Sequence, residues 1–241
     1  MKKLQLDREK QIAAQKEEAD KKRMVIIAAS VVTVIALVIV FVFILMKKTA
    51  EREYQAARAK LYEHKVSDFG GAAFCRSIGD WEPMKKGMVF NTDYTFKTEK
   101  DGFITIALYM QNQVKLGSTS EMVVFKPQLH EKENRVLKER VVVNRGEITV
   151  SISMEGRDLL DVEAPGVVSI GASGLYKMIY NDVKRTGEVV VKHGLVEVLN
   201  KKGEAGGNQK RVKVSGFYKV TFANFEITNP TQASVIQYDW R

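Results

Sequence analysis

The residues of this sequence best suited to chemistry are three histidines and a single cysteine. His64, His130 and His193 stand far apart, and the chain has neither an H-E-x-x-H motif nor paired cysteines at metal-binding spacing. His193 precedes a glycine between two valine-rich segments, which indicates a surface turn residue instead of a metal ligand. No histidine stands at a sequence spacing from the lone Cys75 that would indicate a catalytic Cys–His pair. Cys75 is interpreted as a buried or half-buried thiol and not as a nucleophile.

Acidic and glycine-rich stretches give equally little sign of catalysis. Glu131 and Glu133 lie in the charged stretch "HEKENR" and are expected to face solvent. A pair of glycoside-cleaving carboxylates stays open as an alternative, because their separation in space is invisible in a sequence. The stretch "GEAGGNQK", residues 203–210, is expected to be a hairpin loop, since no helix follows it to bind phosphate. We therefore predict a protein that is not an enzyme, with no catalytic residue, no metal ligand and no cofactor.

The elements that would position any site begin with an apolar run. Residues 24–46 read "MVIIAASVVTVIALVIVFVFILM" and contain no charge. A helix of this length spans about 34 Å, enough to cross a hydrocarbon core of about 30 Å. A cleaved signal peptide would have a shorter apolar region that ends in small residues, whereas this run ends in "FILMKK". The sequence predicts an uncleaved transmembrane helix in contact with membrane lipid.

Charge indicates how that helix is oriented. Residues 1–23 contain more Lys and Arg than Asp and Glu and end in "KKR", which favours a cytoplasmic stub at the N-terminus. The C-terminal part is then expected outside the bacterial inner membrane, in the periplasm or beyond it. The chain has a formal net charge of +9, but its basic residues are scattered, so no nucleic-acid binding is predicted. A basic exported surface suits anionic lipid, cell-wall polymer or simply solubility.

A stalk and a β domain are expected after the membrane. Residues 47–80 are predicted to be a helical stalk and linker, with the helix ending before Gly70 and Gly71. Residues 81–241 then change to short alternating stretches such as "FITIALYM" and "EITVSISM", which are typical of half-buried strands. Turn signals recur at spacings of about 8 to 12 residues. The predicted fold class is mainly β, a sandwich or roll preceded by one transmembrane α-helix.

Two phrases in the β region resemble each other. "VVVNRGEITV", residues 141–150, and "VVVKHGLVEV", residues 189–198, both place a glycine after three valines and two polar residues. We interpret each phrase as a strand that reverses at its glycine into a second strand. The copies are expected at equivalent places of a two-layer β architecture, although coincidence between valine-rich strands stays open.

The order of motifs from residue 81 to about 222 resembles the FecR domain of bacterial envelope proteins. The residues that match that family's pattern are Thr98, Leu116, Ser120, Gly146, Pro165, Val168, Gly171, Tyr176, Gly194 and Val198. The resemblance implies a FecR-like β domain on a single-pass membrane protein. "IGASG" departs from the Arg-Gly-Thr that members often have there. Some members also engage a sigma factor through a long cytoplasmic region, whereas residues 1–23 are too few to build such a domain.

These features predict a binding or scaffold protein within a larger envelope assembly. The expected partners are other envelope proteins, copies of the chain itself, or cell-wall polymer. The alternative is a transmembrane signal transducer, a FecR-type regulator whose short N-terminus contacts a cytoplasmic partner. An enzyme acting on cell-wall polymer is a third class, supported by location alone. Tyr238 and Trp240, near the end of the sequence, either close the core or anchor an interface.

Overall fold

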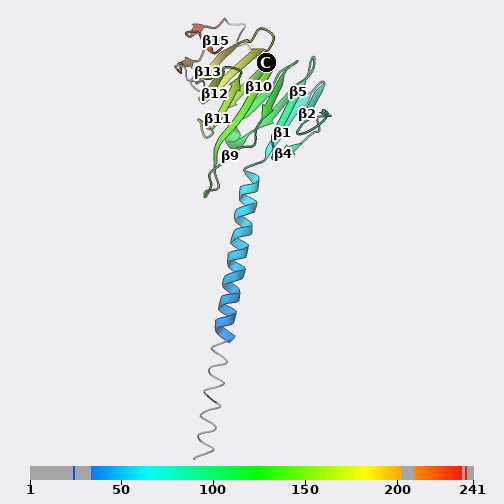
Figure 1. The fold of residues 1–241 in the computed structure, drawn as a ribbon, viewed down its shortest axis with the longest axis vertical. Coiled ribbons are helices and arrows are strands. Elements are labelled where there is room, and N and C mark those ends of the chain that lie inside the picture. Colours follow the sequence, from blue (N-terminus) through cyan, green and yellow to red (C-terminus); the bar gives the residue numbers. More distant parts are fainter. Residues whose placement is uncertain (1–23, 25–33, 202–208, 235–236, 238–241) are drawn as a thin grey trace, which may run out of the picture. The chain divides into compact units, whose positions relative to one another are not determined.

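The computed structural model describes Met24, residues 34–201, residues 209–234 and Gln237 (Figure 1). Residues 34–60 are helical, and the chain divides into two compact units, residues 1–56 and 57–241. No helix in the described part of the chain is long and apolar enough to cross a membrane. The transmembrane helix predicted over residues 24–46 lies partly outside the described residues and stays a prediction, as does the stub at residues 1–23.

The stalk is shorter than the sequence predicted. The helix ends at residue 60, and strand β1 (His64–Gly70) replaces the helix expected as far as Gly70. Its first residues alternate, with His64 and Val66 buried, and it pairs antiparallel with β6 (Phe103–Ala107). The helix-forming residues of this stretch adopt strand geometry because pairing and burial outweigh local propensity. The β domain therefore begins at residue 64 instead of residue 81.

Backbone pairing arranges the strands in two layers that share three long strands. These are β10 (Val136–Ile152), β12 (Val167–Asn181) and β13 (Thr186–Asn200), labelled in Figure 1. Layer 1 contains, in order, β4 (Val89–Phe90), β1, β6, β7 (Gln113–Leu116), the second halves of β10 and β12, the first half of β13, and β15 (Tyr218–Ala223). The short β16 (Glu226–Ile227) and β17 (Thr231–Gln232) pair with β15 at the edge.

Layer 2 uses the other halves of the same long strands. It contains, in order, β3 (Glu82–Pro83), β2 (Ala73–Arg76), β5 (Tyr94–Thr98), β8 (Glu121–Val124), the first half of β10, β11 (Leu160–Ala164), the first half of β12, the second half of β13, and β14 (Arg211–Ser215). The pair β10–β11 is parallel and the other pairs are antiparallel. The short β9 (Gln128–Leu129) pairs with the start of β10, and the 3-10 turn η1 (Tyr109–Gln111) precedes β7.

The repeated phrases mark the places where two long strands cross between the layers. Gly146 in β10 and Gly194 in β13 have φ angles of 85° and 93°, in the left-handed region that favours glycine. The predicted reversal into a second strand is wrong, because each strand continues through its glycine into the other layer. β10 passes from layer 2 to layer 1 and β13 passes the opposite way. The phrase is thus a strand bend used twice.

The core lies between the inward faces of the two layers. Phe90 of layer 1 and Phe96 of layer 2 have ring centroids 5.2 Å apart. Within β12, the Tyr176 hydroxyl of layer 1 lies 3.0 Å from Ser169 Oγ of layer 2. Alternate residues of the paired strands are buried, as the period of two requires. The prediction of a mainly β domain is confirmed.

Candidate functional site

A surface groove at the β15–β16 edge of layer 1 is the candidate binding site. Its cavity has a volume of about 500 Å³. Side chains from β12, β13, β15 and the segment after β16 line it, among them Ile179, Glu188, Thr221, Phe222, Ile227 and Thr228. The backbone places them together, since Glu188 stands opposite both Ile179 and Thr221 in the strand register.

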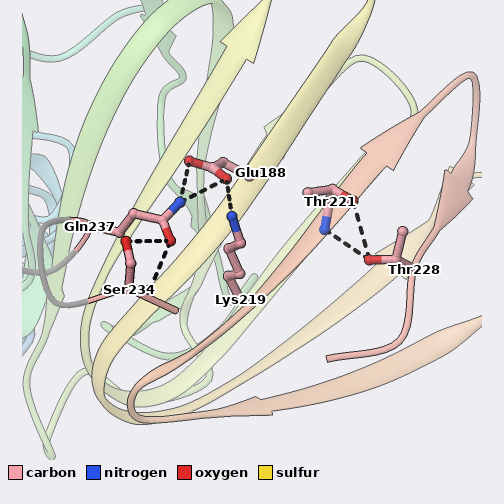
Figure 2. Close-up of polar contacts among 6 residues, drawn as sticks. All are labelled: Glu188, Lys219, Thr221, Thr228, Ser234 and Gln237. Atoms are coloured by element: carbon pink, nitrogen blue, oxygen red, sulfur yellow. Dashed lines mark hydrogen bonds and ion pairs between the residues drawn. The ribbon is translucent and has the colours of Figure 1, made fainter. Parts of the chain in front are cut away.

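Polar contacts fix the side chains along one rim of this groove (Figure 2). The Glu188 carboxylate lies 3.3 Å from Lys219 Nζ and accepts from Gln237 Nε2 at 3.4 Å. Thr228 Oγ1 accepts a hydrogen bond from the backbone N–H of Thr221 at 3.0 Å, and the two threonine hydroxyls lie 3.3 Å apart. These contacts limit the positions that the Glu188 carboxylate and the Thr221 and Thr228 hydroxyls can take.

The groove is lined by both acidic and apolar side chains. Among the described residues that line it, the charged side chains are Glu188 and Glu226, both acidic. Ile179, Ala223 and Ile227 supply apolar surface. Lys219 Nζ lies 3.3 Å from the Glu188 carboxylate and offsets its charge at the groove.

A charged cleft of about 640 Å³ lies on layer 2, lined in part by Lys138, Arg140, Asp161, Glu163 and Lys201. Arg140 donates two hydrogen bonds to Glu163, at 2.7 and 2.8 Å, and Lys201 donates a third. Burial raises the pKa of Glu163, but the bonds from Arg140 and Lys201 outweigh that effect and lower it below its usual value. Lys138 pairs with Asp161 at 2.9 Å. Because each carboxylate of this cleft already has a cationic partner, we interpret the cleft as a structural network.

His64 and Glu139 form a buried pair inside the domain. His64 Nδ1 lies 3.5 Å from Glu139 Oε1, and each residue is 1% exposed. Burial lowers the pKa of His64 to about 4, against the opposing effect of the Phe125 carbonyl 3.3 Å from Nε2. Burial raises the pKa of Glu139 to about 7, although the backbone N–H of Tyr109 donates to its carboxylate at 2.9 Å. Both directions favour a neutral pair.

The other residues singled out in the sequence do not converge. His193 is exposed, as predicted, but it lies at the strand bend of β13 and not in a turn. Glu131 and Glu133 are exposed in the loop after β9. His130 Nδ1 accepts the backbone N–H of Glu133 at 3.1 Å, a contact local to that loop. The described residues hold no group of three or more His, Cys, Asp or Glu side chains placed to bind a metal ion.

Cys75 is a buried thiol, as predicted. It is 4% exposed, and its Sγ lies 3.7 Å from Met88 Sδ. Burial, and then the negative charge of Glu82, raise its pKa, which disfavours the reactive thiolate. Most of the loop at 203–210, and the aromatic residues Tyr238 and Trp240, lie outside the described residues.

Several residues that carry the FecR resemblance lie together at the bend of β10. Thr98 Oγ1 accepts the backbone N–H of Ser120 at 3.1 Å, and Ser120 Oγ accepts the backbone N–H of Glu147 at 2.8 Å. A Cβ atom added to Gly146 would lie 2.1 Å from Ser120 Oγ. These residues therefore hold the crossing strand in place and do not line the groove.

The groove residues themselves were missed in the sequence. Thr221, Thr228 and Glu188 belong to no motif, and only the pairing of β13 with β15 brings them together. The local signal was the alternation of the two strands, which indicates which side chains share a face but not which faces form a groove.

Comparisons with models of protein families and with curated proteins give no match. Among solved structures, the chain is similar to two crystal structures of a candidate anti-sigma factor from Parabacteroides distasonis. For the structure at 2.50 Å resolution the identity is 14% and the TM-score 0.45, over 59% of this chain and 61% of that chain. For the structure at 1.65 Å the identity is 13% and the TM-score 0.44, over 58% and 60%. The chain thus spans about three-fifths of the length of those structures.

Proposed function

We propose that this chain is a membrane-anchored binding protein of the bacterial envelope. Residues 24–46 anchor it in the inner membrane, and the β domain, exported from the cytoplasm, docks onto a partner protein within a larger assembly. The observation that carries the proposal is the groove of about 500 Å³ between β12, β13, β15 and the segment after β16.

The chemistry of the groove supports a protein segment as the occupant. Apolar side chains such as Ile179 and Ile227 offer contact area, and the rim offers Glu188 and the Thr221–Thr228 pair as hydrogen-bonding groups. Protein interfaces combine an apolar centre with a polar rim in this way. The groove is small, so it holds one anchoring stretch of the partner, and the surrounding β surface completes the roughly 800 Å² per partner of a stable interface.

The test begins with partners that are cross-linked to the intact protein in its native membrane and then identified. Ile179→Lys and Thr221→Lys each place a long charged side chain inside the groove and obstruct it, so each should reduce co-purification of a groove-bound partner by about ten-fold or more. Met154→Lys makes the same kind of change at a side chain that is 67% exposed and does not line the groove, and it should leave co-purification unchanged. Equal recovery with all three variants would contradict the proposal.

A second comparison separates this function from signal transduction. Replacing residues 1–46 with an unrelated membrane anchor of the same orientation should preserve the partner, whereas deleting residues 64–241 should abolish its binding. If the replacement loses the partner while residues 1–63 alone keep it, the N-terminal segment is the interaction site. The transducer alternative would then be correct.

A further inference from the structure

The last part of the helix carries an apolar stripe with the spacing of a coiled coil. Ala50, Tyr54, Ala57 and Leu61 follow one another at intervals of four, three and four residues. The first three lie within the helix at residues 34–60, and Leu61 is the next residue. Ala50 and Ala57 are exposed, and Tyr54 and Leu61 are half-buried. This spacing keeps a seam on one side of a helix and corresponds to the a and d positions of a heptad.

Charges flank the stripe in a complementary way. With Tyr54 and Leu61 at a positions, Glu53 takes the preceding g position and Arg58 the following e position. In a parallel pair of helices, a g residue lies beside the e residue five positions further along the partner helix. Glu53 of each chain would therefore face Arg58 of the other. An antiparallel pair would not form this contact.

We propose that the segment from residue 47 to residue 61 forms a parallel two-stranded coiled coil with a second copy of this chain. Two heptads are marginal in water, because even isolated helices of about 12 to 15 residues are. Confinement of both chains to one membrane would raise their effective concentration and supply the parallel orientation. To that extent the inference rests on the proposed anchor, although it requires no occupant of the groove.

The helix end is tied to the β domain, so pairing of stalks would pair two domains. Arg58 Nη1 donates a 2.8 Å hydrogen bond to the Glu131 carbonyl, in the loop after β9. Lys126 Nζ lies 4.2 Å from the centre of the Tyr62 ring, one residue beyond the stripe.

Disulfide formation between single-cysteine variants tests the seam directly. The native Cys75 is buried and gives a low background. Ala57→Cys lies on the seam, whereas Ala59→Cys is the same substitution on the opposite side of the helix. In membranes that contain the full-length protein, mild oxidation should yield about ten-fold more disulfide-linked dimer from Ala57→Cys than from Ala59→Cys. Equal yields, or no dimer from Ala57→Cys, would overturn the proposal.

The charge pair of Glu53 and Arg58 provides an independent test of the coiled coil. Glu53→Lys, made in the Ala57→Cys background, should lower the dimer yield several-fold by placing two positive charges together, and Glu53→Lys with Arg58→Glu should restore it. A double variant as poor as the single one would refute the assigned pairing. Membrane fractionation of the same samples reports whether the anchor holds, and co-purification of a groove partner is a separate readout. Failure of the coiled coil and failure of the proposed function are therefore distinguishable.

Discussion

Glu139 and Glu163 lie on paired parallel strands, and both are nearly buried, yet their surroundings are opposite. Glu163 points to the outer side of layer 2, where Arg140 and Lys201 donate hydrogen bonds to its carboxylate. Glu139 shares the inward face of β10 with Val141 and has His64 as its ionisable neighbour. The pKa of Glu163 is lowered by its cations, which overcome burial, and burial raises the pKa of Glu139 to about 7.

The difference shows that the period of two in a strand decides the charge state of a carboxylate. On the outward face, the long side chains of Arg140 and Lys201 reach Glu163 while remaining in contact with water. On the inward face, a lysine or arginine that reached the carboxylate would have its charge buried, which is costly. The residue beside Glu139 is instead a histidine, and burial favours the neutral form of its imidazole. Between these two pKa values, about 4 for His64 and about 7 for Glu139, both side chains are thus mainly neutral.

The largest effect is expected when Glu139, the acid of the neutral pair, is replaced by glutamine. The folded pKa of Glu139, about 7, is above its ordinary 4.5, so its contribution to stability is present below pH 4.5 and is lost as pH rises to 7. His64 has the opposite sign, because its folded pKa of about 4 is below 6.5. In Glu139→Gln only the His64 contribution remains. The free energy of unfolding should then rise, relative to wild type, by about 3 kcal/mol between pH 4.5 and pH 7, measured by urea denaturation.

The converse variant should reverse that slope. In His64→Leu, the contribution of Glu139 is unopposed, so stability relative to wild type should fall by about 3 kcal/mol as the pH rises from 4 to 6.5. In the wild type the two contributions nearly cancel between about pH 4.5 and 6.5. Parallel slopes in the two single variants would show that the pair does not titrate in this way. The double variant Glu139→Gln with His64→Leu is the control and should lack both contributions.

Much of the β fold was predictable because alternation is a local property. Strands form where the sequence indicates in "FITIA", which is β6, and in "EITVSI", which ends β10. Neither strand continues to the end of its predicted stretch, since Tyr109–Gln111 form the turn η1 and Met154 is 67% exposed. The repeated phrase is a structural unit, as predicted, but it forms a strand bend and not a turn. A glycine with positive φ serves a hairpin turn and a strand bend equally well. Only the pairing of β10 with strands of both layers decides between them.

Features that depend on residues far apart in the chain could not be predicted from local sequence patterns. β1 reads as a continuation of the helix, and only its pairing with β6, more than thirty residues away, makes it a strand. The sequence shows only that His64 stands in no metal-ligand spacing, whereas Glu139 stands beside it in space. The groove has the same origin, since Ile179 and Thr228 belong to segments that share no local motif.

A moderate effect is expected when Arg140, one of the two cations bound to Glu163, is replaced by methionine. Arg140→Met removes two of the three hydrogen bonds to Glu163, whose side chain is 10% exposed. The free energy of unfolding at pH 7 should fall by about 2 kcal/mol, less than for a fully buried pair because Lys201 remains and Arg140 is half exposed. Since the folded pKa of Glu163 is below 4.5, this cost should shrink once the pH falls below that value. Arg140→Met with Glu163→Leu should recover most of the loss.

The smallest expected effect concerns the second cation of the same carboxylate. Lys201→Met leaves the two bonds from Arg140 in place, so it should cost only about 1 kcal/mol at pH 7. Because both cations neutralise one charge, Arg140→Met with Lys201→Met leaves a nearly buried carboxylate without a cationic hydrogen-bond donor. The double variant should therefore lose about 1 kcal/mol more than the sum of the single losses, or else hold Glu163 protonated at a raised pKa. Strict additivity in urea denaturation would mean that the two cations act independently. The contrast with Glu139 would then arise from burial alone and not from the cations that the outward face provides.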